Sequence, residues 1–406
     1  MKANAKLSRA RSKVFHAVTH VWGREYLDVF LNVCIPNQLS PGNVPALPPG
    51  SRYRILTRAI HVVELDAHPM VQALRDVIPV DIVVVEALDR QRGIARGADL
   101  MIACHQRAIA DVLEANAAII MLSADFVLSE NALAAVVQRH HEGYRAVVNT
   151  GLRLAKESFL QCVDQSRTPL AALSSRQLVQ MALPHLHPHT ESMFHDAHPF
   201  SAFPVAVYWR VGSDGLLARC LHLHPLMVDP MSRAPLRGSN DGRYVFRACP
   251  DFSRVHVVTD SDEIQMFELT TARRSVTARC GAGASAWRVA AVAAACDDHQ
   301  IGYWRQYAVR LHTGDFNERW AAAVAASELF ADRVLRLRSY GRIARRWFWF
   351  LERMRQRRER YNRVRRRYQP RGALKKVLRP ARLAAHRSAK TLQKSTRRVL
   401  RHVGAR

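Results

Sequence analysis

The chain has 406 residues, 48% of them hydrophobic, so it can bury a large core, and its size excludes no class of enzyme. Its formal net charge of +27 comes from the C-terminus, because residues 333–406 hold 27 Lys and Arg against two Glu, whereas residues 1–332 hold 34 basic and 32 acidic groups. The body is close to neutral, and any charge-driven partner is expected to bind the tail.

Strand and helix patterns alternate from the start of the chain. Apolar, β-branched segments predict four strands, and apolar residues at helical spacing predict helices between them. The expected strands are 14–19, 53–57, 80–85 and 117–122, and the expected helices are 25–33, 69–77 and 98–114, with a Pro-rich loop at 36–50. This alternation predicts an α/β fold with a mostly parallel, doubly wound sheet and flanking helices.

The pattern changes after residue 139. Strands are expected at 145–149 and 255–259, a hairpin from 205–211 and 216–222, and helices at 153–163, 174–183, 284–295 and 303–337. The expected organisation is a basic N-terminal extension (1–13), a catalytic domain (14–275), a C-terminal helical region (276–340) and a basic, aromatic-containing tail (341–406).

Asp125 is the leading candidate for a site residue. It follows the apolar segment 117–122, and ligands of open α/β sheets bind just outside such strand ends. The competing interpretation is a cap for the next helix, although Ser129 suits that position better. A G-x-G-x-x-G motif follows none of the four expected strands and a P-loop is missing, which disfavours classical dinucleotide oxidoreductases and P-loop kinases.

Several short segments together resemble a known group of enzymes. They are Val18-Thr-His-Val-Trp-Gly23, Pro41-Gly-Asn-Val-Pro45, the strand ending at Thr57, the Asp125 segment, His222-Leu-His224-Pro225 and Asp260-Ser-Asp-Glu263. In order and spacing they resemble bacterial nucleotide-diphospho-sugar transferases, the glycosyltransferases with a single Rossmann-like domain of the GT-A type. The resemblance covers roughly 14–275. It implies that Thr19 and Thr57 lie near the nucleoside and Asp125 near a divalent metal and the diphosphate.

The chain departs from the family pattern at the acidic motif. Such enzymes typically show Asp-x-Asp at this strand end, whereas this chain has Ser123-Ala-Asp125. Mn²⁺ or Mg²⁺ accepts oxygen ligands from diphosphate and water, so a single acid could suffice. The alternative is a degenerate motif and a metal-independent protein. Asp125 is the residue that we assign to the metal from this segment.

Other polar groups are candidates for the chemistry itself. Asp260, Asp262 and Glu263 form the densest acidic cluster of the body, and they could supply a catalytic base or a second metal ligand, although a solvated turn is the alternative. His222 and His224 alternate on an expected strand, which would point both to one face. With Arg153 they could stabilise the departing diphosphate, while a carboxylate aids the acceptor hydroxyl.

Two further functions compete with a glycosyltransferase. A metal-dependent hydrolase would use His222, His224, His185, His187 and an Asp, and it predicts bound zinc or iron. A non-enzymatic scaffold or nucleic-acid-binding protein would instead depend on the tail, with a degenerate α/β body. The expected partners of the transferase are a nucleotide-sugar donor and an unidentified glycan or lipid-linked acceptor.

The tail combines aromatic residues at 347–350 with many arginines, as interfacial helices do on anionic lipid. Nucleic acid and a solvated extension are the alternatives. The seven cysteines are widely spaced and form no C-x-x-C pair, which is typical of reduced thiols. We therefore expect a cytoplasmic protein that is peripheral on the inner face of the membrane.

Overall fold

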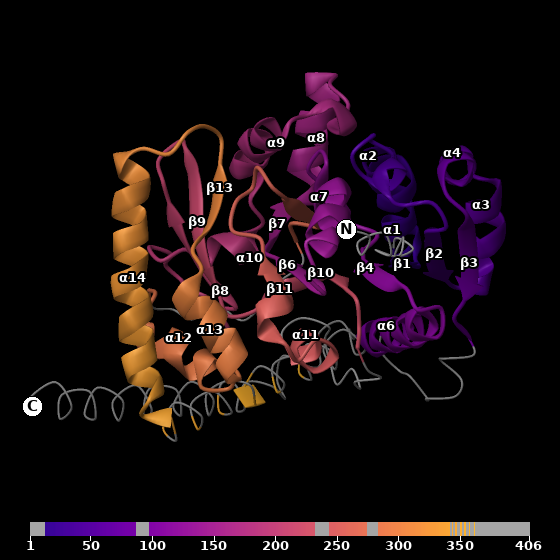
Figure 1. Ribbon diagram of the computed structural model, residues 1–406. Helices are drawn as coiled ribbons and strands as arrows, with labels where there is room; N and C mark the ends of the chain where they lie inside the picture. Colours follow the sequence, from indigo (N-terminus) through magenta and orange to yellow (C-terminus); the bar gives the residue numbers. More distant parts are fainter. Residues whose placement is uncertain are drawn as a thin grey trace, which may run out of the picture. The chain divides into compact units, whose positions relative to one another are not determined.

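A computed structural model describes residues 13–86, 97–231, 243–273 and 283–341, together with seven positions between 343 and 361. The expected N-terminal extension and most of the tail lie outside these residues. The chain divides into two units, Met1–Phe348 and Trp349–Arg406. The elements described below belong to the first unit (Figure 1). Among the described residues, no helix is both long and apolar enough to span a membrane.

The centre of this unit is a seven-stranded mixed sheet with the order β11-β6-β10-β4-β1-β2-β3. Strands β3, β2, β1 and β4 run parallel, as the sequence predicts, and β10 runs antiparallel to both of its neighbours. The strands of this central sheet are β1 (Phe15–Val21), β2 (Arg52–Thr57), β3 (Val80–Val84), β4 (Ala118–Met121), β6 (Ala146–Asn149), β10 (His224–Val228) and β11 (Val255–Val257).

Two three-stranded sheets complete the β structure. The first has the order β5-β12-β7 and contains β5 (Phe126–Leu128), β12 (Met266–Thr270) and β7 (Gly151–Ala155). The second has the order β13-β9-β8 and contains β13 (Val309–His312), β9 (Gly215–Cys220) and β8 (Ala206–Arg210). The hairpin expected from the Gly212-Ser-Asp-Gly215 turn is confirmed as β8 and β9.

The helices vary from short turns to the long α14. Their bounds are α1 (Arg24–Val29), a π-helical segment (Phe30–Cys34), α2 (Ile35–Gln38), α3 (Val62–Ala67), α4 (Pro69–Val77), α6 (Gly97–Glu114), α7 (Ala132–His141), α8 (Lys156–Ser166), α9 (Ser175–Ala182), α10 (Pro188–Glu191), α11 (Arg243–Ala248), α12 (Ala286–Ala293), α13 (Asp298–Gln306) and α14 (Glu318–Arg338). Helix α4 has the predicted bounds, because Pro69 fits its first turn and the His68 side chain accepts a hydrogen bond from Met70 N–H.

Neighbouring residues of β1 show how the central sheet is covered. The Thr19 hydroxyl is 2.8 Å from the Tyr53 hydroxyl, which donates to Gln38 of α2, whereas the His20 ring packs edge-on against His105 of α6. Successive side chains of a strand point to opposite faces. Helices α2 and α6 therefore cover opposite faces of the sheet.

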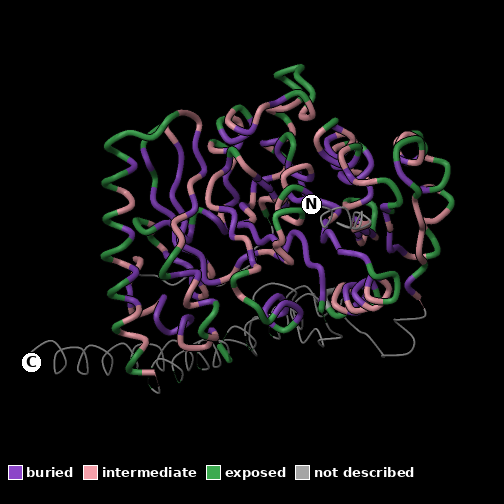
Figure 2. Tube along the Cα trace, in the orientation of Figure 1, coloured by how far each residue is buried: buried purple, intermediate pink, exposed green. Residues whose placement is uncertain are grey.

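A separate apolar cluster forms where α12, α13 and α14 pack on the sheet of β8, β9 and β13. Its members include Trp304 and Trp320, which are almost fully buried. Figure 2 shows α14 largely exposed along its outer side, while its buried residues are Trp320, Ser327, Ala331 and Val334, and α14 contacts α12, β8 and β9. The described residues therefore contain two packed cores within one unit.

The structure differs from the sequence prediction in three elements near the candidate residues. Segment 151–155 is a strand rather than the start of a helix, because it pairs with β12, which the sequence did not predict. Segment 303–337 is not one helix, since β13 interrupts it and pairs with β9. The expected strand 216–222 ends at Cys220, so His222 and His224 do not share a strand.

Candidate functional site

Asp125 lies beyond the carboxyl end of β4, where the sequence placed it. Its backbone is fixed on the small sheet, because Asp125 C=O accepts a 2.8 Å hydrogen bond from Leu269 N–H of β12. The side chain is buried, and its Oδ1 has no hydrogen-bond partner among the described residues. A buried carboxylate oxygen without a partner is costly, and such atoms frequently mark sites of binding or catalysis.

Strand pairing brings an ion pair close to Asp125. The parallel register of β7 and β12 places Arg153 opposite Glu268, and Arg153 Nε donates to Glu268 Oε2 at 2.9 Å. Burial and then the charge of Glu268 raise the pKa of Asp125 to about 7, while a hydrogen bond from Ser123 and the charge of Arg153 oppose the shift. The pKa of Asp125 is therefore suited to proton transfer near neutral pH.

A small crevice opens beside Asp125. It is lined in part by Glu25, Tyr26, Lys156 and Thr271, and its volume is about 10 Å³. Lys156 Nζ is 2.6 Å from Glu25 Oε1, and the Thr271 hydroxyl also hydrogen-bonds this carboxylate. A cavity of this size holds about one water molecule or one ligand atom.

The raised pKa of Asp125 predicts a dependence of stability on pH. The protonated acid stabilises the fold fully below the ordinary pKa of about 3.8, and this stabilisation is lost as the pH rises towards 7. The unfolding free energy of the wild type minus that of Asp125→Asn should thus fall between pH 4 and 7, by up to about 1.4 kcal/mol per pH unit. Urea unfolding of both proteins at a series of pH values measures this difference in unfolding free energy. A difference that does not change with pH would contradict a raised pKa of Asp125.

Thr19 and Thr57, which the family resemblance places near the nucleoside, are both fully buried. The Thr19 hydroxyl hydrogen-bonds Tyr53, and the Thr57 hydroxyl donates to Val21 C=O at 2.6 Å. Both hydroxyls therefore form hydrogen bonds within the protein. The hydrogen bond of Thr57 joins the end of β2 to the end of β1.

His222 and His224 lie in different surroundings. His224 Nε2 donates to Met121 C=O at 3.0 Å. Its ring meets edge-on the ring of Phe126, the residue that follows Asp125 in the chain. His222 lies instead near Cys296, with 3.9 Å between Nε2 and Sγ. The expectation that both rings share one face is therefore wrong, and only His224 lies at the end of β4.

Another polar side chain at this edge of the sheet was missed by sequence reasoning. Asn149 ends β6 directly opposite His224 in the pairing with β10. It is fully buried, and neither atom of its amide has a hydrogen-bond partner within the described ranges. Asn149 and Asp125 thus both carry unsatisfied polar atoms at the carboxyl edge of the sheet.

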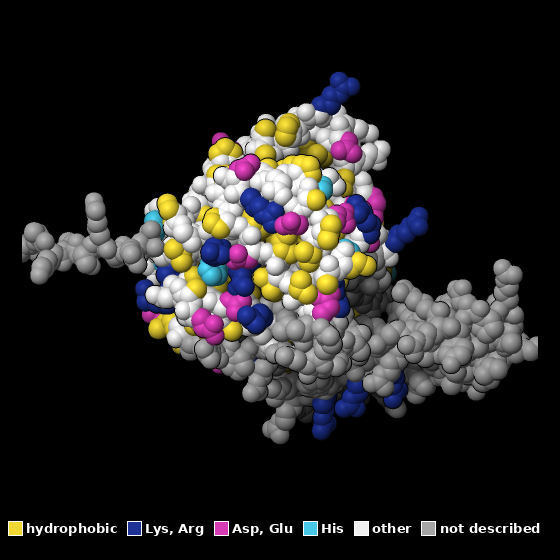
Figure 3. All heavy atoms as spheres, turned by 90° about the vertical axis from the view of Figure 1, so that its right-hand side faces the viewer, with side chains coloured by type: hydrophobic (Ala, Val, Ile, Leu, Met, Phe, Trp, Pro, Cys, Tyr) yellow, Lys and Arg dark blue, Asp and Glu magenta, His cyan; other side chains and the backbone are white. Residues whose placement is uncertain are grey.

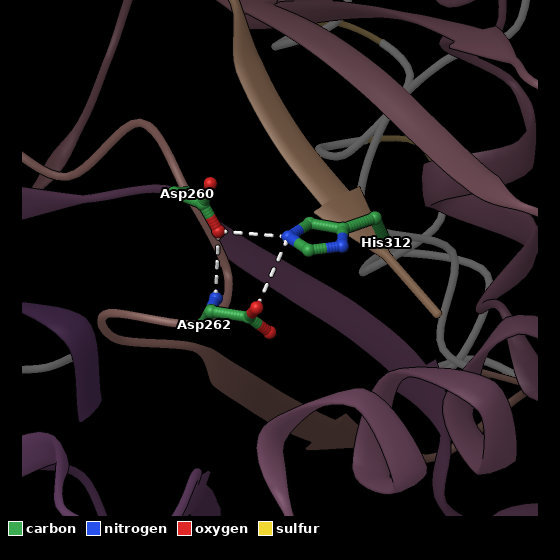
Figure 4. A group of neighbouring side chains, drawn as sticks. All are labelled: Asp260, Asp262 and His312. Carbon is green, nitrogen blue, oxygen red and sulfur yellow. Dashed lines mark hydrogen bonds and ion pairs between the residues drawn. The ribbon is translucent and has the colours of Figure 1, made fainter. Parts of the chain in front are cut away.

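Asp260 and Asp262 form a second acidic group together with His312 of β13 (Figure 4). His312 Nε2 is 2.8 Å from Asp260 Oδ1 and 3.7 Å from Asp262 Oδ2, and its Nδ1 is 2.7 Å from Gly314 C=O. Nδ1 faces a carbonyl oxygen and donates to it, whereas Nε2 faces the two carboxylates, and one ligand atom from each of the three side chains lies within 4.8 Å of the others. Arg176 also binds Asp262 at 2.9 Å. These contacts join β13 to the turn after β11.

Glu263 is also held by basic groups. Arg139 Nε is 2.6 Å and His256 Nε2 is 2.8 Å from Glu263 Oε1. Burial alone would raise the pKa of Glu263, but the hydrogen bonds from His256 and Arg139 outweigh burial and lower it. These contacts join the Glu263 side chain to α7 and β11.

The histidines proposed for a hydrolase do not gather at one point. His187 Nδ1 accepts from His189 N–H at 3.0 Å and its Nε2 donates to Thr271 C=O at 3.1 Å, so neither nitrogen is left for a metal. Burial lowers the pKa of His187, consistent with a neutral ring. His185 lies against the Phe159 ring. This geometry gives the hydrolase no support.

Sequence reasoning also missed Glu25, Lys156 and Glu268, which surround Asp125. The alternation in Met266-Phe-Glu-Leu-Thr270 is a strand signal that could have located Glu268. Lys156 follows Arg153 by three residues, but its place in the crevice depends on the turn from β7 into α8. Comparison with protein-family models and with curated protein sequences gave no match to this chain.

Proposed function

We propose that this protein is a glycosyltransferase that moves a sugar from a nucleotide-diphospho-sugar to an acceptor hydroxyl. The observation that carries the proposal is the buried Asp125 carboxylate, with one unpartnered oxygen, beyond the end of the fourth parallel strand. Ligands bind outside the carboxyl ends of such strands. The family resemblance places the diphosphate of the donor at the same strand end.

Asp125 is the proton acceptor in this proposal. Burial and Glu268 raise its pKa to about 7, so the carboxylate can take the proton of the acceptor hydroxyl near neutral pH. As the hydroxyl oxygen bonds to the anomeric carbon, the bond from this carbon to the diphosphate breaks, and the diphosphate leaves with the bonding electrons. Asp262 pairs with Arg176, Glu263 pairs with Arg139, and Asp260 hydrogen-bonds His312, so we assign these acids no part in the proton transfer.

Two cations would bind the leaving diphosphate. Lys156 lines the crevice with Asp125, and Arg153 is close enough for its charge to act on the Asp125 carboxylate. Both now pair with carboxylates, Lys156 with Glu25 and Arg153 with Glu268. A phosphate oxygen can exchange with either carboxylate, because Lys and Arg bind both groups by charge-assisted hydrogen bonds.

The described residues around Asp125 do not fit a Mg²⁺ or Mn²⁺ site. They offer one unpartnered carboxylate oxygen, and the neighbouring carboxylates Glu25 and Glu268 are already paired with Lys156 and Arg153. A hard cation needs several oxygen ligands, and the two cationic side chains oppose it. We therefore derive no step through a metal, and neutralisation of the diphosphate falls to Arg153 and Lys156.

A thermal-shift panel with the full-length protein tests this proposal. The ligands are UDP, GDP, CDP and their sugars, each with and without Mn²⁺ or Mg²⁺. One nucleotide series should raise the melting temperature, since a ligand at about 100 times its dissociation constant adds roughly 2.7 kcal/mol. The shift should be smaller for Arg153→Gln and unchanged for the exposed matched control Arg167→Gln.

Two results would count against the proposal. If no nucleotide or nucleotide sugar changed the melting temperature, the transferase assignment would fail. If the shift occurred only with Mn²⁺ or Mg²⁺ present, donor binding would stand, but the metal-free assignment of Arg153 and Lys156 would be wrong.

A further inference from the structure

Two carboxylates and one imidazole converge where β13 passes the turn after β11 (Figure 4). Asp260 and Asp262 lie on the turn, and His312 is the last residue of β13. One ligand atom of each side chain lies within 4.8 Å of the other two. The His312 side chain is 2% exposed, whereas those of Asp260 and Asp262 are 35 and 39% exposed. This set, which we call the Asp-Asp-His group, is therefore open to an ion from solution.

A hydrogen bond outside the Asp-Asp-His group orients the His312 ring. Nδ1 donates to Gly314 C=O at 2.7 Å, so in the neutral ring Nε2 carries the lone pair. Figure 4 shows Nε2 directed at the two carboxylates. Imidazoles that bind metals almost always donate their other N–H to a carbonyl or a carboxylate in this way. A lone pair cannot bond to a carboxylate oxygen, so either a proton on Nε2 or a metal cation lies between them.

The distances within the Asp-Asp-His group match those between ligands of one ion. Asp260 Oδ1 is 2.8 Å from His312 Nε2, which a proton can bridge, but Asp262 Oδ2 is 3.7 Å from this nitrogen, beyond a hydrogen bond. Two ligands that each lie about 2.1 Å from a tetrahedral Zn²⁺ are roughly 3.4 Å apart. A proton on Nε2 therefore serves one carboxylate, whereas a cation serves both.

The backbone holds the turn and β13 together before any ion binds. Arg310 N–H donates to Thr259 C=O at 2.8 Å, and Ser261 N–H donates to Arg310 C=O at 2.9 Å. The Ser261 hydroxyl also accepts a hydrogen bond from His312 N–H at 3.1 Å. A ligand set that is already in place loses little conformational freedom when it binds an ion.

We propose that Asp260, Asp262 and His312 bind a divalent first-row cation, with Zn²⁺ as the best fit. One imidazole nitrogen with two carboxylate oxygens suits Zn²⁺ better than Mg²⁺ or Ca²⁺, which prefer oxygen ligands alone. Three protein ligands leave the fourth position of Zn²⁺ open to water or to another ligand. The site follows β11 rather than β4, the strand before Asp125, and it uses no residue of the Asp125 site.

Arg176 competes with the cation at Asp262. Its guanidinium is 2.9 Å from Asp262 Oδ2 and 2.9 Å from Asp315 Oδ1. Arg176 can therefore keep Asp315 as its partner when a cation binds Asp262. Removal of this positive charge in Arg176→Gln should strengthen Zn²⁺ binding about fivefold. A network of ion pairs without a metal predicts no such gain.

Isothermal titration calorimetry with Zn²⁺ alone tests the site in the full-length protein after removal of metals with EDTA. The wild type should bind Zn²⁺, and Mn²⁺ more weakly. Asp260→Asn and His312→Gln should each weaken Zn²⁺ binding at least about 100-fold, because loss of an outer partner alone costs about 10–100-fold. Melting curves show whether each variant is folded, and the exposed Asp262→Asn replaces His312→Gln if the latter unfolds. Because no nucleotide is added, the outcome is independent of the glycosyltransferase proposal.

Asp66→Asn is the matched control for Asp260→Asn. On the face that Figure 3 shows, acidic side chains are interspersed with basic ones, and the ion pairs of this region include Arg75 with Asp66 and Arg24 with Glu64. Asp66 is exposed and pairs with an arginine, but it belongs to no group of metal-ligating side chains among the described residues. Its replacement should change the Zn²⁺ affinity by less than about twofold.

Three results would overturn the proposal. The first is a wild type that binds neither Zn²⁺ nor Mn²⁺, which would leave a proton on His312 Nε2 as the bridge to Asp260. The second is an equal Zn²⁺ affinity of the wild type, Asp260→Asn and His312→Gln, because the ion would then be bound elsewhere. The third is a Zn²⁺ affinity of Arg176→Gln no higher than that of the wild type, which would remove Asp262 from the ligands and leave only two.

Discussion

Replacing Asp125 by asparagine is expected to abolish sugar transfer while the protein stays folded. Asparagine has the same shape but cannot take a proton from the acceptor hydroxyl, so kcat should fall by at least about 100-fold. The buried site tolerates the neutral amide, because burial already favours the uncharged form of Asp125. Turnover of the donor found in the thermal-shift panel, measured as release of the nucleoside diphosphate, tests this expectation.

Asp164→Asn is the matched control for this variant. Asp164 is exposed on α8, and its replacement should leave turnover and melting temperature unchanged. Full activity of Asp125→Asn would remove Asp125 from the chemistry, even if donor binding persisted. A large loss of melting temperature in the variant would instead show that Asp125 acts mainly on the fold.

Replacing Arg219 by methionine is expected to cost about 3 kcal/mol of stability. Arg219 is buried on β9, where Nη1 donates at 3.1 Å to both Trp304 C=O and Arg305 C=O, and Nε donates to the Ser327 hydroxyl at 2.9 Å. Its charge therefore lies at the C-terminus of α13, where a helix favours a cation. Methionine fills most of the space but leaves both carbonyls without a donor, and each such loss costs about 1–3 kcal/mol.

Urea unfolding followed by circular dichroism measures this loss. Arg305→Met is the matched control, since the Arg305 side chain is exposed and should change stability by less than about 0.5 kcal/mol. An unfolding free energy of Arg219→Met equal to that of the wild type would show that the guanidinium does not join β9 to α13 and α14.

The first half of the fold could be predicted from the sequence because its signals are local. The four parallel strands are short segments rich in apolar and β-branched residues, of which β4 is fully buried and β3 lies at the sheet edge, and Pro69 sets the start of α4. The errors occur where a segment is weakly patterned and its state depends on a distant partner. β7 and β12 pair across more than 100 residues, so even the alternating pattern of Met266–Thr270 does not reveal which strand it joins.

The sequence by itself determined the parallel α/β body, the hairpin of β8 and β9, the place of Asp125 at a strand end and the concentration of charge in the tail. Only the tertiary structure decided the surroundings of Asp125. The register of β7 and β12 places Glu268 beside Arg153, and burial together with the charge of Glu268 raises the pKa of Asp125, while Arg153 opposes the shift. Likewise, only the tertiary structure shows that His222 and His224 have different surroundings. It also shows that Asp260 and Asp262 contact His312. Local pattern reports which face of an element is apolar, whereas electrostatics depends on distances between residues far apart in the chain.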